Sequence, residues 1–178
     1  FHNAGYFVLE GEDFVKTFRL DAAPDPAFLP LFAELVRIDR VVRRSHTELV
    51  AMSRILLVRH LARRPADNPV RRFATRFAAD LPLLQDRGLA HYHAWAFATL
   101  RQLGAAAELI ACYLRWLADD RVAPATAAYD AISTGAKAFI LKAARAVNGK
   151  KPLDASPQLA EWATAWDTAI EVLTGVVR

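Results

Sequence analysis

The chain has 178 residues, of which 54% are apolar and 24% charged, and its formal net charge at pH 7 is +4. This length suffices for one hydrophobic core, or for one helical domain with a fragment of a second. No apolar run approaches the roughly 18 residues that a membrane-spanning helix needs. The single Cys112 excludes an internal disulfide framework and any multi-cysteine metal site. We therefore expect a soluble protein of the cytoplasm without a membrane partner.

Residues 1–10 begin without an initiator Met, and their composition predicts a short apolar strand. One strand cannot pair its own backbone groups, so we expect it to belong to a sheet whose other strands precede this chain. A turn follows at residues 11–14, and three prolines between residues 24 and 30 keep the chain extended. Residues 31–39 fit a strand or a helix, with the strand slightly favoured. Residues 1–39 are thus predicted to be the last strands of an upstream α/β domain and a linker.

Residues 40–178 are predicted to form a helical bundle domain. Ser45 and Glu48 have the spacing of a capping box, so a helix should run from there to about Arg63. Its apolar residues cover a broad face, which predicts a central and mostly buried helix. Asn68 and Pro69 begin the next helix, which should bend at Pro82 and end near residue 88.

The third predicted helix has an apolar seam from Leu89 to Leu117, in which His93 takes one position. Gly104 either splits this helix or permits a neighbour to approach closely. Two further helices are predicted over residues 124–147 and 156–176. The short loops between helices favour a mainly α fold, an antiparallel bundle of about five helices with one or two N-terminal strands.

Basic residues are concentrated in one region of the chain. Residues 37–76 contain eleven arginines and three acidic residues, a net charge of +8, so the remainder carries about −4. Such a surface could receive an acidic partner, for example nucleic acid, a phosphate group or the acidic helix of a carrier protein. The alternative is that these arginines simply cover solvated helix faces.

Catalytic motifs are scarce. The sequence has no glycine-rich phosphate loop, no zinc-binding helix motif and no nucleophile elbow. His91 and His93 lie on different sides of a helix and cannot share a metal ion. We expect His93 to be a hydrogen-bonded core residue rather than a pocket residue. Cys112 lies in the middle of a helix, which predicts a packed, unreactive thiol.

Two blocks carry a family resemblance. The first is Phe1-His2-Asn3-Ala4-Gly5-Tyr6-Phe7 with the following residues 9–14, and the second covers residues 97–109 and 113–117. Both resemble a bacterial family of unassigned function that is encoded beside amino acid:carrier protein ligases and small acyl carrier proteins. Full-length members have an additional amino-terminal portion with a Cys-containing segment and a His-containing strand. That family is distantly similar to papain-like acyltransferases of butirosin biosynthesis, which move an acyl group from a carrier-protein thioester to an amine.

The resemblance implies that this chain is the C-terminal helical part of an acyltransferase that acts on aminoacyl or acyl carrier-protein thioesters. The upstream Cys would be the nucleophile and the upstream His its base, and Asn3, or the adjacent His2, would orient the imidazole. Without the Cys-bearing half, the chain would not be active by itself. The alternative is a non-catalytic binding or scaffold module for the carrier protein and its ligase. No intrinsic cofactor is expected, only phosphopantetheine carried on the partner.

Two sets of binding residues follow from this interpretation. We expect the first set to line the cleft, and it comprises Tyr92, His93, Arg101 and Trp116. We expect the second set to meet the acidic carrier, where charge speeds encounter more than it deepens affinity, and it comprises Arg40, Arg43, Arg44, Arg63 and Arg64. A nucleic-acid binder could use the same arginines, but the sequence has no helix-turn-helix, glycine-rich or exposed aromatic signature, which argues against that function.

Overall fold

The computed structural model describes residues 8–18 and 37–177, and it divides into two units, Phe1–Arg43 and Arg44–Arg178. The first unit contains the short helix α1 (Gly11–Lys16) and the 3-10 turn η1 (Ile38–Arg40). None of the residues of α1 is buried. The ammonium group of Lys16 lies 3.6 Å from the Glu12 carboxylate, an exposed ion pair that contributes little stability.

The predicted N-terminal strands are not found in residues 8–18 and 37–177. The prediction for residues 1–10 lies mostly outside the described residues, and residues 8–10 have no regular secondary structure. The turn expected at residues 11–14 is instead the start of α1. Residues 31–36 also lie outside, and the favoured strand is wrong at Ile38–Arg40, because the Val41 amide donates to the Ile38 carbonyl and closes a turn. The papain-like half and the domain boundary at residue 39 stay predictions.

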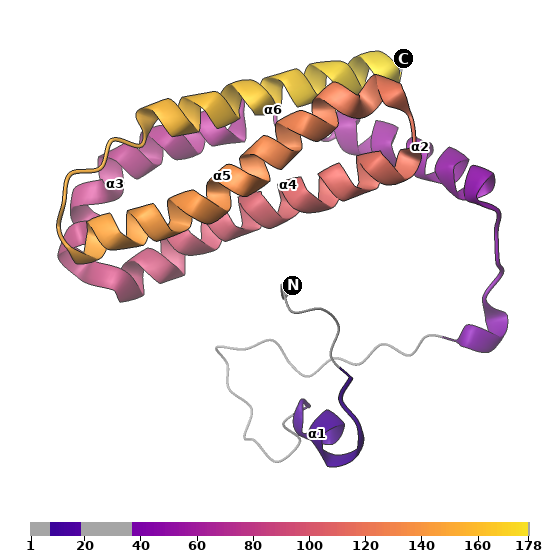
Figure 1. Ribbon diagram of the computed structural model, residues 1–178, viewed down its shortest axis with the longest axis horizontal. Coiled ribbons are helices and arrows are strands. Elements are labelled where there is room, and N and C mark those ends of the chain that lie inside the picture. Colours follow the sequence, from indigo (N-terminus) through magenta and orange to yellow (C-terminus); the bar gives the residue numbers. More distant parts are fainter. Residues whose placement is uncertain (1–7, 19–36, 178) are drawn as a thin grey trace. The chain divides into compact units, whose positions relative to one another are not determined.

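The second unit is a bundle of long helices, which confirms the mainly α prediction with five helices. Figure 1 shows that α3, α4, α5 and α6 alternate in direction, and that α2 and α3 follow one another in the same direction. α5 is central and contacts α3, α4 and α6. No helix in the described part of the chain is both long and apolar enough to cross a membrane. The helices are α2 (His46–Ala62), α3 (Pro69–Tyr92), α4 (Ala98–Leu117), α5 (Ala123–Asn148) and α6 (Ser156–Val176).

The predicted helix starts are confirmed by their capping groups. The Ser45 hydroxyl accepts from the Glu48 amide at 3.3 Å, and the Glu48 carboxylate accepts from the Ser45 amide at 2.9 Å, so the capping box is complete. The Asn68 side-chain oxygen accepts from the Val70 amide at 2.9 Å, with Pro69 in the first helical position. These groups satisfy backbone donors that have no partner inside the helix.

An aromatic row joins three helices in the core. Phe77 of α3, Phe139 of α5 and Trp162 of α6 are all buried, with ring centroids 5.6 and 5.7 Å apart in edge-to-face pairs. Gly104 does not split α4. A Cβ atom at Gly104 would lie 3.0 Å from Cβ of Ala136, so the glycine permits α4 and α5 to approach closely.

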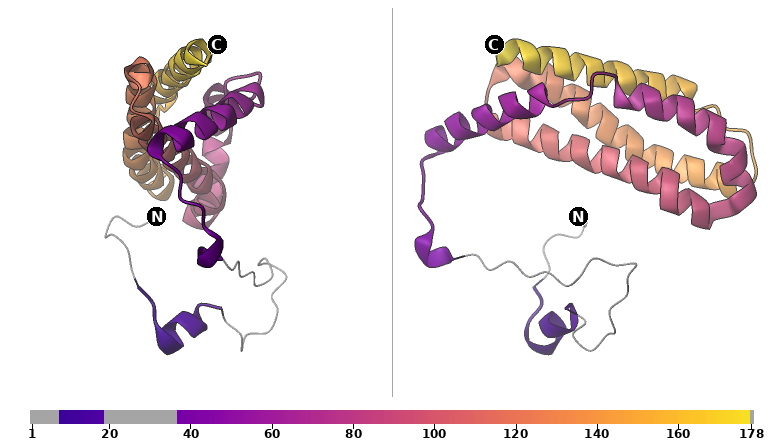
Figure 2. Two further views of the ribbon diagram at one scale, coloured as in Figure 1. Left: turned by 90° about the vertical axis from the view of Figure 1, so that its right-hand side faces the viewer. Right: turned by 180° about the vertical axis from the view of Figure 1, so that it is seen from behind.

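The prediction that the helix after Ser45 is central and mostly buried is wrong. In α2, Leu61 is the only buried residue. Figures 1 and 2 show why: α2 lies at the end of the bundle where α6 also ends, so neighbouring helices cover only one of its sides. A broad apolar face indicates a buried helix only where enough neighbours surround it.

The predicted helix end near residue 88 is confirmed by a kink at Gly88, but the predicted bend at Pro82 and the path from Gly88 into α4 differ from the prediction. Within α3 the torsion angles depart from helical values at Gly88 (φ 78°, ψ −170°) rather than at Pro82. A π-helical turn, η2 (His93–Phe97), then leads into α4. A π turn holds more residues than an α-helical turn, so the buried positions are Tyr92, Ala96 and Leu100, four residues apart. His93 is therefore exposed, and its prediction as a core residue is wrong.

Candidate functional site

The side of α2 that faces away from the bundle is apolar although it is exposed. We call five residues the α2 outer face, each between 42% and 57% exposed: Leu49, Met52, Ile55, Leu56 and Val58. The opposite side packs on the core through Val50, Leu57 and Leu61. A helix that is apolar all round is normally buried, and contiguous exposed apolar surface marks an interaction site. The α2 outer face is therefore a candidate binding surface.

Arginines surround this surface. Residues 44–64 contain five arginines and one carboxylate, Glu48. Arg54 is half-buried and donates to the Asp119 carboxylate at 2.6 Å. Arg59 and Arg63 form no ion pair with any carboxylate in the described part of the chain, and both are exposed. Their charge is thus open to a partner.

The structure brings together some of the arginines predicted to meet a carrier protein. Arg44 lies just before α2, with its guanidinium 3.7 Å from the Glu48 carboxylate. Arg63 and Arg64 follow the other end of the 17-residue helix, about 25 Å away at 1.5 Å per residue. The Arg64 guanidinium donates to the Leu61 carbonyl at 2.7 Å. Arg40 and Arg43 belong to the first unit.

Two contacts fix α2 beside the end of α4. At its first turn, the His46 ring meets the Trp116 indole edge-to-face at 5.1 Å, and Trp116 in turn stacks on Tyr113 at 6.0 Å. In the loop just after α4, the carboxylate of Asp119 accepts from Arg121 at 2.7 Å and from Arg54 of α2. These two guanidinium groups, Arg121 first, hold the pKa of Asp119 well below its usual range.

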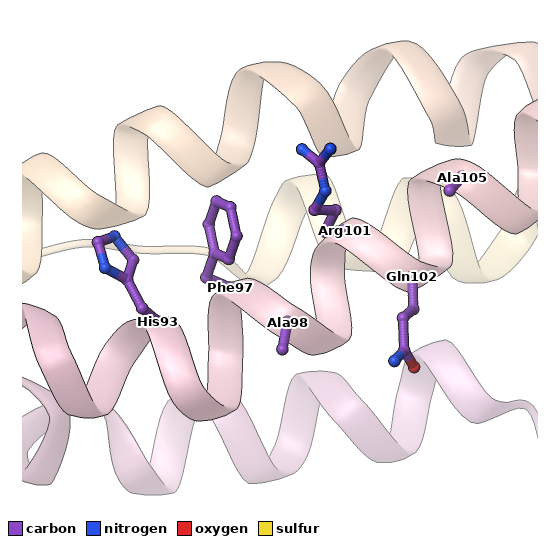
Figure 3. Close-up of a pocket in the computed structure, with 6 residues that line it drawn as sticks. All are labelled: His93, Phe97, Ala98, Arg101, Gln102 and Ala105. Atoms are coloured by element: carbon purple, nitrogen blue, oxygen red, sulfur yellow. The ribbon is translucent and has the colours of Figure 1, made fainter. Parts of the chain in front are cut away.

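A second candidate surface is an open groove along the π turn and the start of α4 (Figure 3). The side chains of His93, Phe97 and Arg101 project from one side of the helix, and that of Gln102 projects from the other. The His93 and Phe97 rings meet edge-to-face at 5.2 Å. Ala98 and Ala105 complete the lining of this open groove, which has a volume of about 590 Å³ and is formed by one continuous stretch of chain.

Of the residues predicted to line a cleft, the structure joins only His93 and Arg101. Tyr92 is fully buried, and its hydroxyl donates to the Ile140 carbonyl at 2.8 Å, so its prediction as a lining residue is wrong. Burial raises the pKa of Tyr92 to about 12. Trp116 lies 15 positions after Arg101, about 22 Å along α4. Sequence reasoning missed Phe97, whose four-residue spacing from His93 and Arg101 is the signal that could have identified it.

The predicted catalytic residues are not tested by the structure. His2 and Asn3 lie outside the described residues, so their pairing with an upstream base stays a prediction. Cys112 is exposed instead of packed, with Sγ 3.6 Å from an Arg115 guanidinium nitrogen. Among residues 8–18 and 37–177, no group of three or more ligating side chains is arranged to hold a metal ion.

Fold and surface together define a helical-bundle domain with an apolar, arginine-flanked helix at one end. The chain belongs to the family of the DUF1839 C-terminal domain, a domain of unknown function, whose model matches residues 46–175. The match begins at the first residue of α2 and ends in the last turn of α6. Neither a curated protein nor a solved structure matches the chain. The prediction of a family of unassigned function is confirmed, whereas its genomic neighbourhood and papain-like similarity stay predictions.

Proposed function

We propose that this chain is a protein-binding module that receives an acidic carrier protein. The carrier's phosphopantetheine arm would hold an aminoacyl or acyl thioester, loaded by an amino acid:carrier protein ligase. The observation that supports this proposal is the charge around α2, where residues 44–64 contain five arginines and one carboxylate. Such a local excess attracts an acidic protein and raises the association rate more than the affinity.

The exposed apolar residues of α2 add the short-range part of the interaction. Stable protein interfaces have an apolar, desolvated centre and a polar rim. Met52 and Leu56 would form that centre, with Arg44 and Arg63 at the rim. Nucleic acid would use the arginines but not the apolar centre, because protein contacts to DNA and RNA go mainly to phosphates, sugars and base edges. We therefore favour a protein partner.

Within this function, we propose that the module is the C-terminal helical part of an acyltransferase. A cysteine outside this chain would attack the thioester carbonyl, the carrier thiol would leave, and an amine would then take the acyl group from the enzyme sulfur. Asn3 or His2 would orient the histidine base. The alternative is a scaffold that holds the loaded carrier and its ligase without transfer. The bundle's role, carrier binding, is the same in both cases.

Titration of an aminoacyl-loaded acyl carrier protein with the chain tests the binding step. At low salt, we expect the double variant Arg44→Glu, Arg63→Glu to bind at least about tenfold more weakly, and the difference to shrink as salt screens the charges. Arg87→Glu is the matched control, since Arg87 is an exposed arginine of α3 away from α2. Unchanged affinity of the double variant at low salt would exclude the arginines of α2 as the carrier surface.

Mass spectrometry of the carrier separates transfer from scaffolding. The loaded carrier is mixed with candidate amines and either the chain or a longer family protein that includes the cysteine-containing portion. Unloading that needs the longer protein and is lost when its cysteine is changed supports the acyltransferase. A stable complex without unloading in both mixtures supports the scaffold. Unloading by the chain alone that is lost in Cys112→Ser would contradict both.

A further inference from the structure

We infer that the α2 outer face binds a single acidic amphipathic helix of a partner protein, lying along α2. The inference rests on the proposed function only in that the partner is acidic, and it does not require acyl transfer. It adds what the arginines alone do not specify, namely the secondary structure of the bound segment and the apolar contacts that hold it.

The size of the apolar surface matches a short helix. Among residues 49–58, Arg54 is the only charged residue, and its guanidinium is turned to Asp119. Met52, Ile55 and Leu56 are the centre of this stretch, and each is at least half exposed. Ten residues of helix span about 15 Å, nearly three turns. A partner helix of similar length would cover the stretch with side chains spaced three and four residues apart.

The charges at the ends of α2 select an acidic partner. Arg44 precedes the first turn, and Arg59 and Arg63, which are four residues apart and so lie on one side, occupy the last turn and its end. Arg59 and Arg63 have no ion-pair partner among the described carboxylates. A helix with apolar residues in its middle and carboxylates in its first and last turns would complement both the apolar and the charged parts of this surface.

Two other occupants fit the surface less well. A second copy of the chain would bring arginine-bearing ends together in either orientation of two paired α2 helices, and like charges at an interface oppose association. A lipid surface is bound by helices with basic residues along a solvated polar face. In α2 the side opposite the apolar face packs on the bundle instead, through Leu57 and Leu61.

The surface is already formed before binding. The His46 ring contacts Trp116 at 5.1 Å, and Arg54 donates to Asp119 at 2.6 Å, so the start and the middle of α2 are tied to the end of α4 and the loop after it. A partner therefore does not have to order α2 when it binds, which removes an entropic penalty from the binding free energy.

Fluorescence anisotropy with a labelled peptide tests the inference. The probe is a helical peptide of about five turns, with leucines at helical spacing in its middle and glutamates in its first and last turns. We expect it to bind the 178-residue chain, and we expect Met52→Ser, Leu56→Ser to weaken binding at least about tenfold, as for truncation of central contacts. The matched control is Leu141→Ser on α5, because Leu141 is 58% exposed and Leu56 is 54% exposed.

Several outcomes would overturn the inference. One is that a peptide with lysines in place of the glutamates binds equally well. Another is that the chain prefers phosphatidylglycerol vesicles and loses them in the Met52, Leu56 variant. A third is that the chain self-associates and the same variant abolishes the self-association. Circular dichroism of each variant verifies folding, which substitutions at exposed positions should preserve. If the carrier binds but the Met52, Leu56 variant binds it equally well, the inference fails together with the apolar centre proposed for the carrier interface, while carrier binding through the arginines of α2 stands. If the peptide binds and the carrier does not, the inference stands and the proposed function fails.

Discussion

Gly135 of α5 lies directly against the indole ring of Trp162 of α6. A Cβ atom built at Gly135 would come within 2.7 Å of Cε2 and Cζ2 of that ring, closer than any real carbon contact. Trp162 is buried and also meets Phe139 edge-to-face at 5.7 Å. The absence of a side chain at one helical position is therefore what permits the largest core residue to pack between α5 and α6.

This contact predicts opposite effects for two glycine-to-alanine substitutions. Gly135→Ala should lower the free energy of unfolding by about 1 to 3 kcal/mol, because the added methyl group overpacks the core. Gly175→Ala, also in a helix but with nothing within 4 Å of the new Cβ, should raise it by up to about 1 kcal/mol through helix propensity. Urea unfolding followed by circular dichroism measures both. Equal stability of Gly135→Ala and the parent would show that the ring moves aside freely.

Asn68 connects the start of α3 to the middle of α6. Its side-chain oxygen caps α3, and its nitrogen donates to the Ala163 carbonyl at 2.8 Å and to the Asp167 carboxylate at 2.9 Å. Asn68→Ala should lower the free energy of unfolding by about 1 to 2 kcal/mol, the usual loss for a helix cap. Asn68→Asp keeps the cap acceptor but places two carboxylates together, so its stability should recover on acidification. Unfolding curves at neutral and acidic pH measure the stabilities of the parent and both variants. If the capping bond alone mattered, Asn68→Asp would be as stable as the parent at neutral pH.

Asp119 should make folding sensitive to acid. The guanidinium groups of Arg121 and Arg54 lower the pKa of this carboxyl in the folded state. Its stabilising contribution is therefore present above the ordinary carboxyl pKa of about 4 and is lost as the pH falls further. Asp119→Asn should be less stable than the parent at neutral pH, and the gap should narrow in acid. Thermal unfolding over this pH range measures the gap, and Asp86→Asn, at an exposed position, is the control. A gap that does not change with pH would contradict the prediction.

Tyr92 should make folding sensitive to alkali. Burial raises the pKa of Tyr92 to about 12 and also raises that of Tyr129, whereas an unfolded tyrosine ionises near 10. As the pH rises, the tyrosine ionises in the unfolded state before it ionises in the folded state, and this lowers the free energy of the unfolded state. The free energy of unfolding should therefore fall as the pH rises from about 10 towards 12. Tyr92→Phe removes the hydrogen bond to the Ile140 carbonyl, so its free energy of unfolding at neutral pH should be about 1 kcal/mol lower than that of the parent. Between pH 10 and 12 its free energy of unfolding should fall less than that of the parent, because the buried ionisable group is gone. Tyrosinate absorbance and unfolding curves would detect both effects, and ionisation of every tyrosine near pH 10 without unfolding would argue against it.

Local chemistry explains which parts of the fold could be predicted. The capping box at Ser45, the start at Asn68 and Pro69, and the ends near Gly149 and Leu117 depend on side chains and backbone groups within one turn of one another. Such short-range bonds form in the same way whatever surrounds the helix. The starts of α2 and α3 and the ends of α4 and α5 followed from them.

The candidate site was harder to predict because it depends on what lies opposite each helix. The arginines of residues 44–64 were visible in the sequence, but the apolar face beside them was assigned to the core. His93 was assigned to the core and Tyr92 to a cleft, and the structure reverses the two because the π turn shifts the helical phase between Tyr92 and Leu100. The prediction assumed a regular α-helix from Leu89 to Leu117, and a regular helix has no such shift.

The sequence by itself determined the five long helices of residues 46–176, most of their ends, and that positive charge gathers around α2. Only the tertiary structure decided that α2 is covered on one side, that His93 is exposed and Tyr92 buried, and that Gly135 receives the Trp162 ring. The physical reason is that the interactions involved act between residues at different separations along the chain. Hydrogen bonds at helix ends and charge density are fixed by residues near one another in the chain, whereas burial depends on helices that are distant in sequence and on the direction from which they approach.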